Sequence, residues 1–220
     1  MGVARSIERR LERLVDGLAA QLFRGRVQPV ELGTRVVREA DLSRFDTAVG
    51  PGAPNAFRVV LGGEPVEAEV LRRVGAEVAR FVDDSAADRG WRLDGPTTVE
   101  LLVDPSRRPA HVEVESRTEP GPRAAWAVLV PIDAGGDPLE VTVNRAVIGR
   151  SRDADVRLQH EDVSRRHALL WQESGSTWLA DLGSSNGTFL EGDPFREPTA
   201  IQGGDRFAFA DHPFVLEPPP

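Results

Sequence analysis

The stretch that decides the fold runs from Ile148 to Thr188 and reads IGRSRDADVRLQHEDVSRRHALLWQESGSTWLADLGSSNGT. Apolar, strand-like runs in it alternate with three short polar segments, Gly149-Arg150-Ser151, Ser164-Arg165-Arg166-His167 and Ser184-Ser185-Asn186-Gly187-Thr188. Each segment alone is common by chance, so their order and spacing carry the information. Ser164 follows Arg150 by 14 residues, and Asn186 follows Ser164 by 22.

The apolar runs around these segments predict strands. Short strands with frequent turns are typical of a β-sandwich, whose connecting loops cluster at its two ends. We expect strands at Val156–Leu158, Ala168–Trp171, Thr177–Asp181 and Phe189–Leu190, and earlier at Trp126–Val130 and Leu139–Val143, where apolar residues alternate.

The three segments and their spacing resemble the signature of the forkhead-associated (FHA) domain, a phosphothreonine reader, and the resemblance covers Trp126 to Leu216. A phosphothreonine carries nearly two negative charges and three acceptor oxygens, so its reader needs a fixed cation and several neutral donors. The resemblance implies that Arg150 is this cation and that Ser164 donates its hydroxyl and its backbone N–H to the phosphate.

The same resemblance implies roles for the remaining polar residues. Arg165 and Ser185 would add contacts to the phosphate or the peptide, and Asn186 would hydrogen-bond the peptide main chain, since an amide both donates and accepts. His167 would brace the loops rather than touch the ligand. Gly149 and Gly187 would meet backbone requirements, where a side chain would block a turn or a close approach.

The charge distribution fits a compact anionic ligand. The net charge is −8, and residues 117–220 contribute −6 of it, which argues against a nucleic-acid partner. Five of the ten arginines in this half nevertheless fall between Arg150 and Arg166. We expect Arg152, Arg157 and Arg166 to pair with nearby acids, namely Asp153, Asp155, Glu161 and Asp162.

Composition limits the remaining possibilities. The chain has 220 residues and no cysteine, which excludes disulfides and thiolate metal sites. No run of about 18 apolar residues is present, so we expect no membrane insertion. No metal or cofactor motif is found, and we expect no cofactor and a cytoplasmic location.

The region before the sandwich predicts a compact α+β domain over residues 1–116, followed by a Pro/Gly linker at 117–124 and the FHA domain at 125–220. Apolar residues at helical spacing predict helices at 7–22, from Pro29 onward and over 66–89, and residues 46–55 read as a loop. Strands are expected at 57–61, 99–103 and 110–114, the last two joined as a hairpin.

An enzyme is the less favoured alternative. Ser164, His167 and Asp181 are the residue types of a hydrolase triad, but no Gly-x-Ser-x-Gly elbow is present. We therefore expect no catalytic residues.

The two domains together are similar to bacterial two-domain FHA proteins with an N-terminal domain of unknown function. The residues that carry this similarity are Pro29-Val30-Glu31-Leu32 and Pro54-Asn55-Ala56-Phe57-Arg58-Val59. It implies a signalling adaptor that binds a phosphothreonine-containing protein, either a Ser/Thr kinase or its substrate, in the control of cell-wall synthesis or division. The alternative is a scaffold whose N-terminal domain binds the main partner, such as nucleic acid, with the FHA domain as a tether.

Two threonines are candidate phosphorylation sites. Thr47 lies in the glycine- and proline-rich loop and Thr118 in the expected linker, both in segments that a kinase could bind in extended form. Phosphorylation of either residue would let the FHA domain of one molecule bind another.

Overall fold

The computed structural model describes residues 29–132 and 136–219. The helix expected over residues 7–22 lies outside this part. Contacts divide the chain into one unit of Met1–Asp46, Gly52–Ala86 and Leu93–Gly121, and a second of Thr47–Pro51, Ala87–Arg92 and Pro122–Pro220. We call them unit 1 and unit 2.

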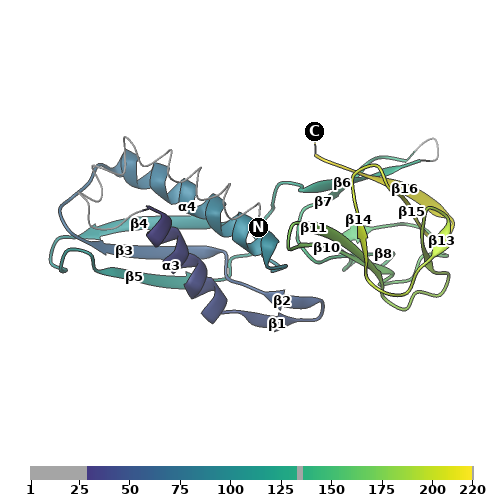
Figure 1. Cartoon of the computed structure of the whole chain (residues 1–220), viewed down its shortest axis with the longest axis horizontal. Coiled ribbons are helices and arrows are strands. Elements are labelled where there is room, and N and C mark those ends of the chain that lie inside the picture. The colour runs from purple at the N-terminus through teal and green to yellow at the C-terminus, as the bar shows by residue number, and fades with distance from the viewer. Residues whose placement is uncertain (1–28, 133–135, 220) are drawn as a thin grey trace. The chain divides into compact units, whose positions relative to one another are not determined.

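Unit 1 is built on a three-stranded sheet in the order β4-β3-β5 (Figure 1). The central strand β3 (Ala56–Gly62) pairs in parallel with β4 (Thr98–Asp104) and antiparallel with β5 (Val112–Arg117). The expected hairpin between the last two strands is therefore wrong, because β3 lies between them. A parallel neighbour needs a crossover connection, and the helix between β3 and β4 provides it.

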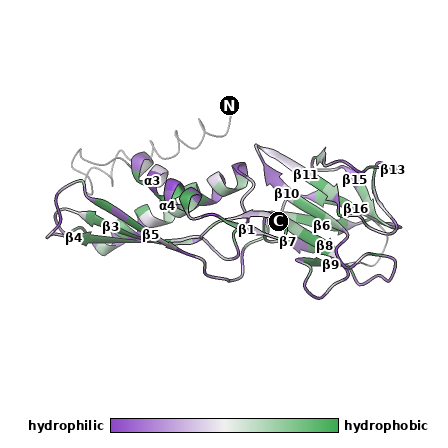
Figure 2. Ribbon diagram, turned by 90° about the horizontal axis from the view of Figure 1, so that it is seen from below, coloured by the Kyte–Doolittle hydropathy of each residue, from purple (hydrophilic) through white to green (hydrophobic). Residues whose placement is uncertain are grey.

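Two helices cover one face of this sheet (Figures 1 and 2). Helix α3 (Pro29–Leu42) begins at the expected proline and buries the expected stripe of Leu32, Val36, Val37 and Ala40. Helix α4 (Ala68–Asp88) buries Val70, Val74, Val78 and Val82, and it lies so close to β4 that a Cβ on its Gly75 would be 2.5 Å from the carbonyl oxygen of Val99. No helix in the described part of the chain is both long and apolar enough to cross a membrane.

Two segments that the sequence assigned to loop or linker are more ordered than expected. Residues 46–55 include a short hairpin of β1 (Phe45–Thr47) and β2 (Gly50–Gly52). The start of the expected linker is hydrogen-bonded within unit 1, because the buried Asn55 side chain donates to the carbonyl of Glu119 and accepts from its N–H, both at 2.9 Å. By its contacts, unit 1 thus extends to Gly121.

Unit 2 is a β-sandwich, as the sequence predicts. One sheet has the order β14-β11-β10-β8-β9 and the other the order β13-β12-β15-β16-β6-β7. The strands are β6 (Ala127–Pro131), β7 (Leu139–Val141), β8 (Ala146–Gly149), β9 (Val156–Arg157), β10 (Ala168–Glu173), β11 (Ser176–Asp181), β12 (Thr188–Leu190), β13 (Asp193–Pro194), β14 (Thr199–Ile201), β15 (Arg206–Phe209) and β16 (His212–Glu217).

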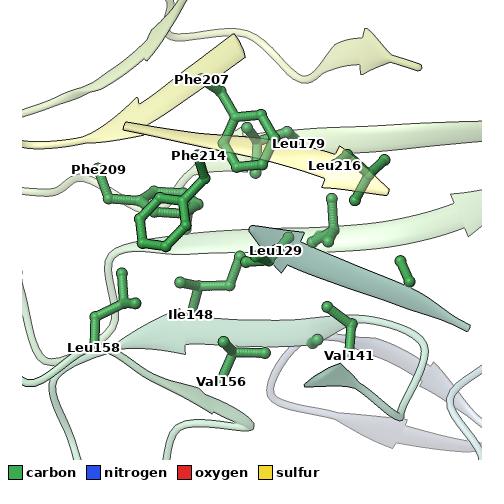
Figure 3. Close-up of a cluster of buried hydrophobic side chains, with 14 of the residues drawn as sticks. Leu129, Val141, Ile148, Val156, Leu158, Leu179, Phe207, Phe209, Phe214 and Leu216 are labelled. Carbon is green, nitrogen blue, oxygen red and sulfur yellow. The ribbon is translucent and has the colours of Figure 1, made fainter. Parts of the chain in front are cut away.

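The core of unit 2 lies between the two sheets (Figure 3). Leu129, Ile148 and Leu179 are fully buried, and Phe207, Phe209 and Phe214 pack on one another with ring centroids 5.6 to 6.4 Å apart. Burying apolar surface on this scale fixes the strands, so the loops at the sandwich end start from rigid positions.

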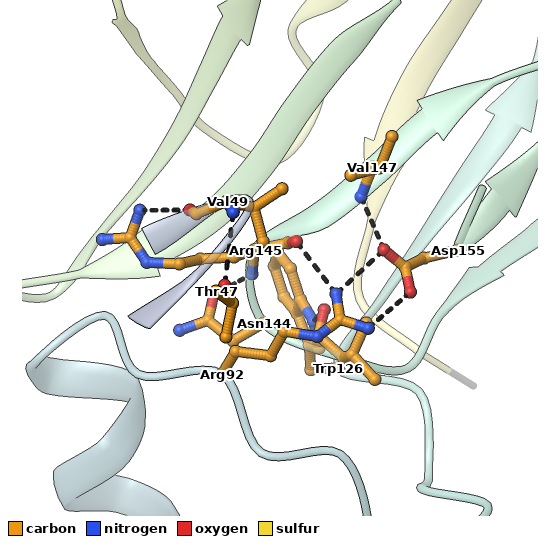
Figure 4. Close-up of polar contacts among 9 residues, drawn as sticks. Thr47, Val49, Arg92, Trp126, Asn144, Arg145, Val147 and Asp155 are labelled. Carbon is orange, nitrogen blue, oxygen red and sulfur yellow. Dashed lines mark hydrogen bonds and ion pairs between the residues drawn. The ribbon is translucent and has the colours of Figure 1, made fainter. Parts of the chain in front are cut away.

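Unit 2 also includes two short segments from the first half of the chain, and two arginines hold them (Figure 4). Arg92 donates to both carboxylate oxygens of Asp155, at 2.7 and 2.9 Å, and Asp155 also accepts the N–H of Val147 at 2.8 Å. Arg145, which has a left-handed φ of 56°, donates to the carbonyls of Gly90 and Val49 at 2.5 and 3.2 Å.

Candidate functional site

Three loops of the sandwich carry the three polar segments of the sequence. They connect β8 to β9, β9 to β10 and β11 to β12. Backbone hydrogen bonds join the first two loops, because the N–H of Arg150 donates to the carbonyl of Ser164 at 3.0 Å and the N–H of Ser151 to that of Arg165 at 3.2 Å. The structure therefore brings together segments that lie far apart in the sequence.

Gly149 is required by this contact between loops. A Cβ atom on Gly149 would lie 2.4 Å from the carbonyl oxygen of Arg165 and 2.9 Å from that of Ser164. Such distances are far inside van der Waals contact, so any side chain would push the two loops apart. The close approach places Arg150 directly beside Ser164.

The buried ring of His167 connects the second loop to the third. Its Nδ1 accepts the N–H of Ser164 at 3.2 Å, so its Nε2 carries the proton and donates to the carbonyl of Gly187 at 2.9 Å. One departure from the expectation follows. The backbone N–H of Ser164 is already bonded to His167, so only the hydroxyl of Ser164 is available as a donor to a ligand.

Ser164 and Asn186 tie the loops together and keep donors at the surface. The Ser164 Oγ accepts the N–H of Ser185 at 3.0 Å, which leaves its own hydroxyl hydrogen free to donate. The amide of Asn186 donates to the carbonyl of Asp162 at 2.7 Å. Ser185 and Asn186 are exposed, and Ser164 is partly exposed.

Asp181 shapes the third loop, a role that the sequence reading did not assign. Its carboxylate accepts four hydrogen bonds, from the N–H groups of Gly183 and Ser184 and the hydroxyls of Ser184 and Thr188. Partial burial raises the pKa of Asp181, but these hydrogen bonds outweigh it and hold the pKa below its ordinary value. An aspartate two residues before a glycine is a turn pattern that would have indicated this role.

The arginines of the first two loops are not neutralised as expected. Within residues 29–132 and 136–219, no ion pair involves Arg150, Arg152, Arg157, Arg165 or Arg166, all of which are exposed. Two of the four expected partners are bound elsewhere, because Asp155 pairs with Arg92 and Asp162 with His212. The pairing predicted for Arg152, Arg157 and Arg166 is therefore wrong, and the loops present uncompensated positive charge.

The geometry of Ser164, His167 and Asp181 is not that of a hydrolase triad. Both ring nitrogens of His167 are bonded to backbone groups, and neither is bonded to the Ser164 hydroxyl. Asp181 binds the third loop instead of the imidazole.

The two candidate phosphorylation sites differ in accessibility. The Thr47 hydroxyl donates to the carbonyl of Gly50 at 2.7 Å and accepts the N–H of Val49, so it is held inside the β1–β2 turn. Thr118 is exposed, and its hydroxyl has no hydrogen bond to any residue that the structure describes. Of the two, Thr118 is better placed to meet a kinase.

The sandwich and its loops define the class of the protein. Residues 146–210 match the model of the FHA domain, so unit 2 contains such a domain, a class of phosphothreonine-binding modules that are not enzymes. Residues 5–115, half of the chain, match the model described as the N-terminal domain of FhaA. The chain belongs to this FhaA family, and the resemblance seen in the sequence is confirmed.

Curated relatives match less than half of this chain. The transcriptional regulatory protein EmbR of Mycobacterium tuberculosis is 32% identical over 105 residues, 47% of this chain and 26% of EmbR. The FHA domain-containing protein FhaA of the same species is 36% identical over 75 residues, 34% of this chain and 14% of FhaA. The chain thus spans about a quarter or less of the length of these relatives.

Two solved structures of FHA domains are similar to part of this chain. A crystal structure of the FhaA FHA domain complexed with the intracellular domain of Rv3910 is 28% identical and covers 41% of this chain and 99% of that one, with a TM-score of 0.38. A structure from an analysis of phosphothreonine-dependent FHA domain interactions is 29% identical and covers 43% and 97%, with a TM-score of 0.39.

Proposed function

We propose that the chain is a signalling adaptor whose FHA domain binds phosphothreonine peptides through Arg150, Ser164, Arg165, Ser185 and Asn186. Membership of the FHA class supports the ligand type. In this assignment, Arg150 pairs with the phosphate and the Ser164 hydroxyl donates to it. Arg165 and Ser185 add contacts beside it, and Asn186 binds the peptide main chain.

One observation carries the proposal. Arg150 and Arg165 are exposed cations in an acidic domain, and neither forms an ion pair within the part of the chain that the structure describes. The backbone hydrogen bond from Arg150 to Ser164 holds the start of one cationic side chain beside a hydroxyl whose hydrogen is free to donate. An arginine that starts beside neutral donors on joined loops suits a phosphate dianion.

Membership of the FhaA family supports a proposal for the setting of the adaptor. We infer that its partner is a phosphorylated Ser/Thr kinase or a substrate of one, in bacterial control of cell-wall synthesis or division. A cytoplasmic location belongs to this proposal, because such kinases phosphorylate their partners there.

The scaffold alternative gains no support from the exposed sheet face in the described part of unit 1. The sheet face opposite the helices carries a cavity of about 450 Å³, and its charged lining mixes Arg58 and Arg107 with Asp104, Glu113 and Glu115. A nucleic-acid surface requires an excess of positive charge, which this lining does not have.

Capture of the full chain on an immobilised degenerate phosphothreonine peptide library tests the proposal. We expect retention on this library, none on its unphosphorylated counterpart, and several-fold to tens-fold weaker retention on a phosphoserine library. The weaker retention of phosphoserine peptides follows from their lack of the threonine methyl group. Burying one methyl group stabilises a complex by about 0.8 kcal/mol, and close packing around it adds to this. Equal retention on the phosphorylated and unphosphorylated libraries would overturn the proposal.

A further inference from the structure

Two histidines and an aspartate converge beside the third loop, outside the residues assigned to the peptide. His160 and Asp162 belong to the turn before Ser164, and His212 begins β16 in the opposite sheet. The Nε2 of His212 lies 2.9 and 3.0 Å from the two carboxylate oxygens of Asp162. The rings of His160 and His212 stack with their centroids 3.6 Å apart.

This convergence is notable in a chain with four histidines and no cysteine. His167 is buried with both nitrogens bonded, and His111 lies in unit 1 beside Arg107. The other two histidines, 52 positions apart in the sequence, lie face to face next to a carboxylate. The hydrogen bond to Asp162 accounts for the position of His212, but it does not account for His160.

The donor atoms have the chemistry of a metal site and lie close to the spacing that such a site needs. One ligand atom from each of the three residues lies within 4.8 Å of the others. Ligands at about 2.0–2.2 Å from a tetrahedral Zn²⁺ are separated by about 3.3 Å, so Asp162 and His212 need to open only slightly. The ring of His160 makes no hydrogen bond to any described residue, so it is free to turn from the stack toward the metal.

We propose that His160, Asp162 and His212 form a binding site for a divalent transition metal of the zinc class. Imidazole nitrogen with a single carboxylate favours such metals over Mg²⁺ or Ca²⁺, which prefer all-oxygen sites. Three protein ligands leave the remaining position to water.

The metal would link the two sheets at the end that carries the three loops. Asp162 precedes Ser164 by two residues, and its backbone carbonyl accepts the amide of Asn186 at 2.7 Å. Binding to the folded state alone would also raise the thermal stability of unit 2. Its four tryptophans, Trp91, Trp126, Trp171 and Trp178, are all those in the chain, so tryptophan fluorescence reports on this unit.

Titration of the chelator-treated full chain with ZnCl₂ by calorimetry, with MgCl₂ in parallel, tests the site. We expect one equivalent of Zn²⁺ to bind, Mg²⁺ not to bind in the same range, and Zn²⁺ to raise the fluorescence-detected midpoint of unfolding. His160→Gln should bind Zn²⁺ at least about tenfold more weakly and lose this rise, because one of three ligands is gone. His111→Gln, a histidine outside the cluster, should behave as the wild type.

His160→Gln is the most informative variant, because the ring that it removes makes no hydrogen bond in the described structure. His160→Asn serves in its place if the glutamine variant does not show the near-UV circular dichroism of the wild type. The proposal is overturned if the wild type takes up no Zn²⁺ saturably. It is equally overturned if the His160 variant binds Zn²⁺ as tightly as the wild type does.

Discussion

At the scale of single residues, His167 connects two loops of the site through both of its ring nitrogens. Replacing it with alanine leaves the N–H of Ser164 and the carbonyl of Gly187 without their partners and opens a cavity. We expect His167→Ala to lower the free energy of unfolding by about 2–4 kcal/mol in urea titrations followed by tryptophan fluorescence. Arg157→Ala, which removes an exposed side chain of the same unit, is the control. An equal midpoint for the two variants would refute the bracing role.

Gly149 allows a second test at this scale. A methyl group here would overlap the carbonyl of Arg165, so Gly149→Ala should destabilise unit 2 by about 1–3 kcal/mol and weaken phosphothreonine-library retention. Gly203→Ala is the matched control, because the nearest atom to its added Cβ lies 3.9 Å away. Unchanged stability of Gly149→Ala would show that the two loops do not need this close approach.

Which residues gather at the site could be predicted at this scale, but their individual bonds could not. The resemblance to the FHA signature, carried by Arg150, Ser164 and Asn186, implied that their loops meet. Two of these bonds depend on side-chain positions that distant strands set. They are the bond between the Ser164 N–H and His167 and the bond between Arg92 and Asp155. Sequence neighbours suggested the wrong ion pairs for this reason.

At the scale of elements, the loop from β11 to β12 depends on the ionised carboxylate of Asp181. Because its pKa in the folded protein lies below the ordinary 3.8, ionised Asp181 stabilises the fold above that value. This contribution is lost as the pH falls through the lowered pKa. We expect Asp181→Asn to be about 1–3 kcal/mol less stable at pH 7, with the difference from wild type shrinking below about pH 4 in urea titrations.

The control for this prediction is Asp211→Asn. Asp211 is an exposed aspartate in the turn between β15 and β16. The free energy of unfolding of the Asp211→Asn variant should equal that of the wild type at each pH. A difference between Asp181→Asn and wild type that stays constant down to the lowest pH would contradict the role of ionisation.

Periodicity predicted most elements correctly, but it did not predict which strands are neighbours. Alternating residues placed β3, β4 and β5 within a few positions of where they lie. The hairpin expectation failed because consecutive strands are usually adjacent, whereas here the helix α4 carries the chain across to a parallel partner. The strand order β4-β3-β5 places β3 at the centre of the sheet, and its residues on the helix side are buried as a result.

At the scale of the molecule, the pair of Arg92 with Asp155 joins residues 63 positions apart within unit 2 (Figure 4). Their side chains are only 18% and 19% exposed, so the pair is shielded from solvent more than a surface ion pair. Arg92→Ala leaves Asp155 without its bidentate partner and should destabilise unit 2 by about 1–3 kcal/mol. The control is Arg157→Ala, which removes an exposed arginine with no described ion pair and should change the urea midpoint little. An equal loss of stability in both variants would contradict the structural role of the pair.

The most direct test of the central claim is the affinity of Arg150→Ala for a phosphothreonine peptide selected from the library, measured by calorimetry. Loss of one side of a close charge pair costs about 2–5 kcal/mol, so binding should weaken by about thirty-fold or more. Ser164→Ala should weaken it by about ten- to a hundred-fold. Arg152→Ala removes an exposed arginine of the same loop that has no contact with Ser164, so it should weaken binding by no more than about two- to threefold. If folded Arg150→Ala and Ser164→Ala bind the peptide with unchanged affinity, the assignment of this site to phosphothreonine is wrong.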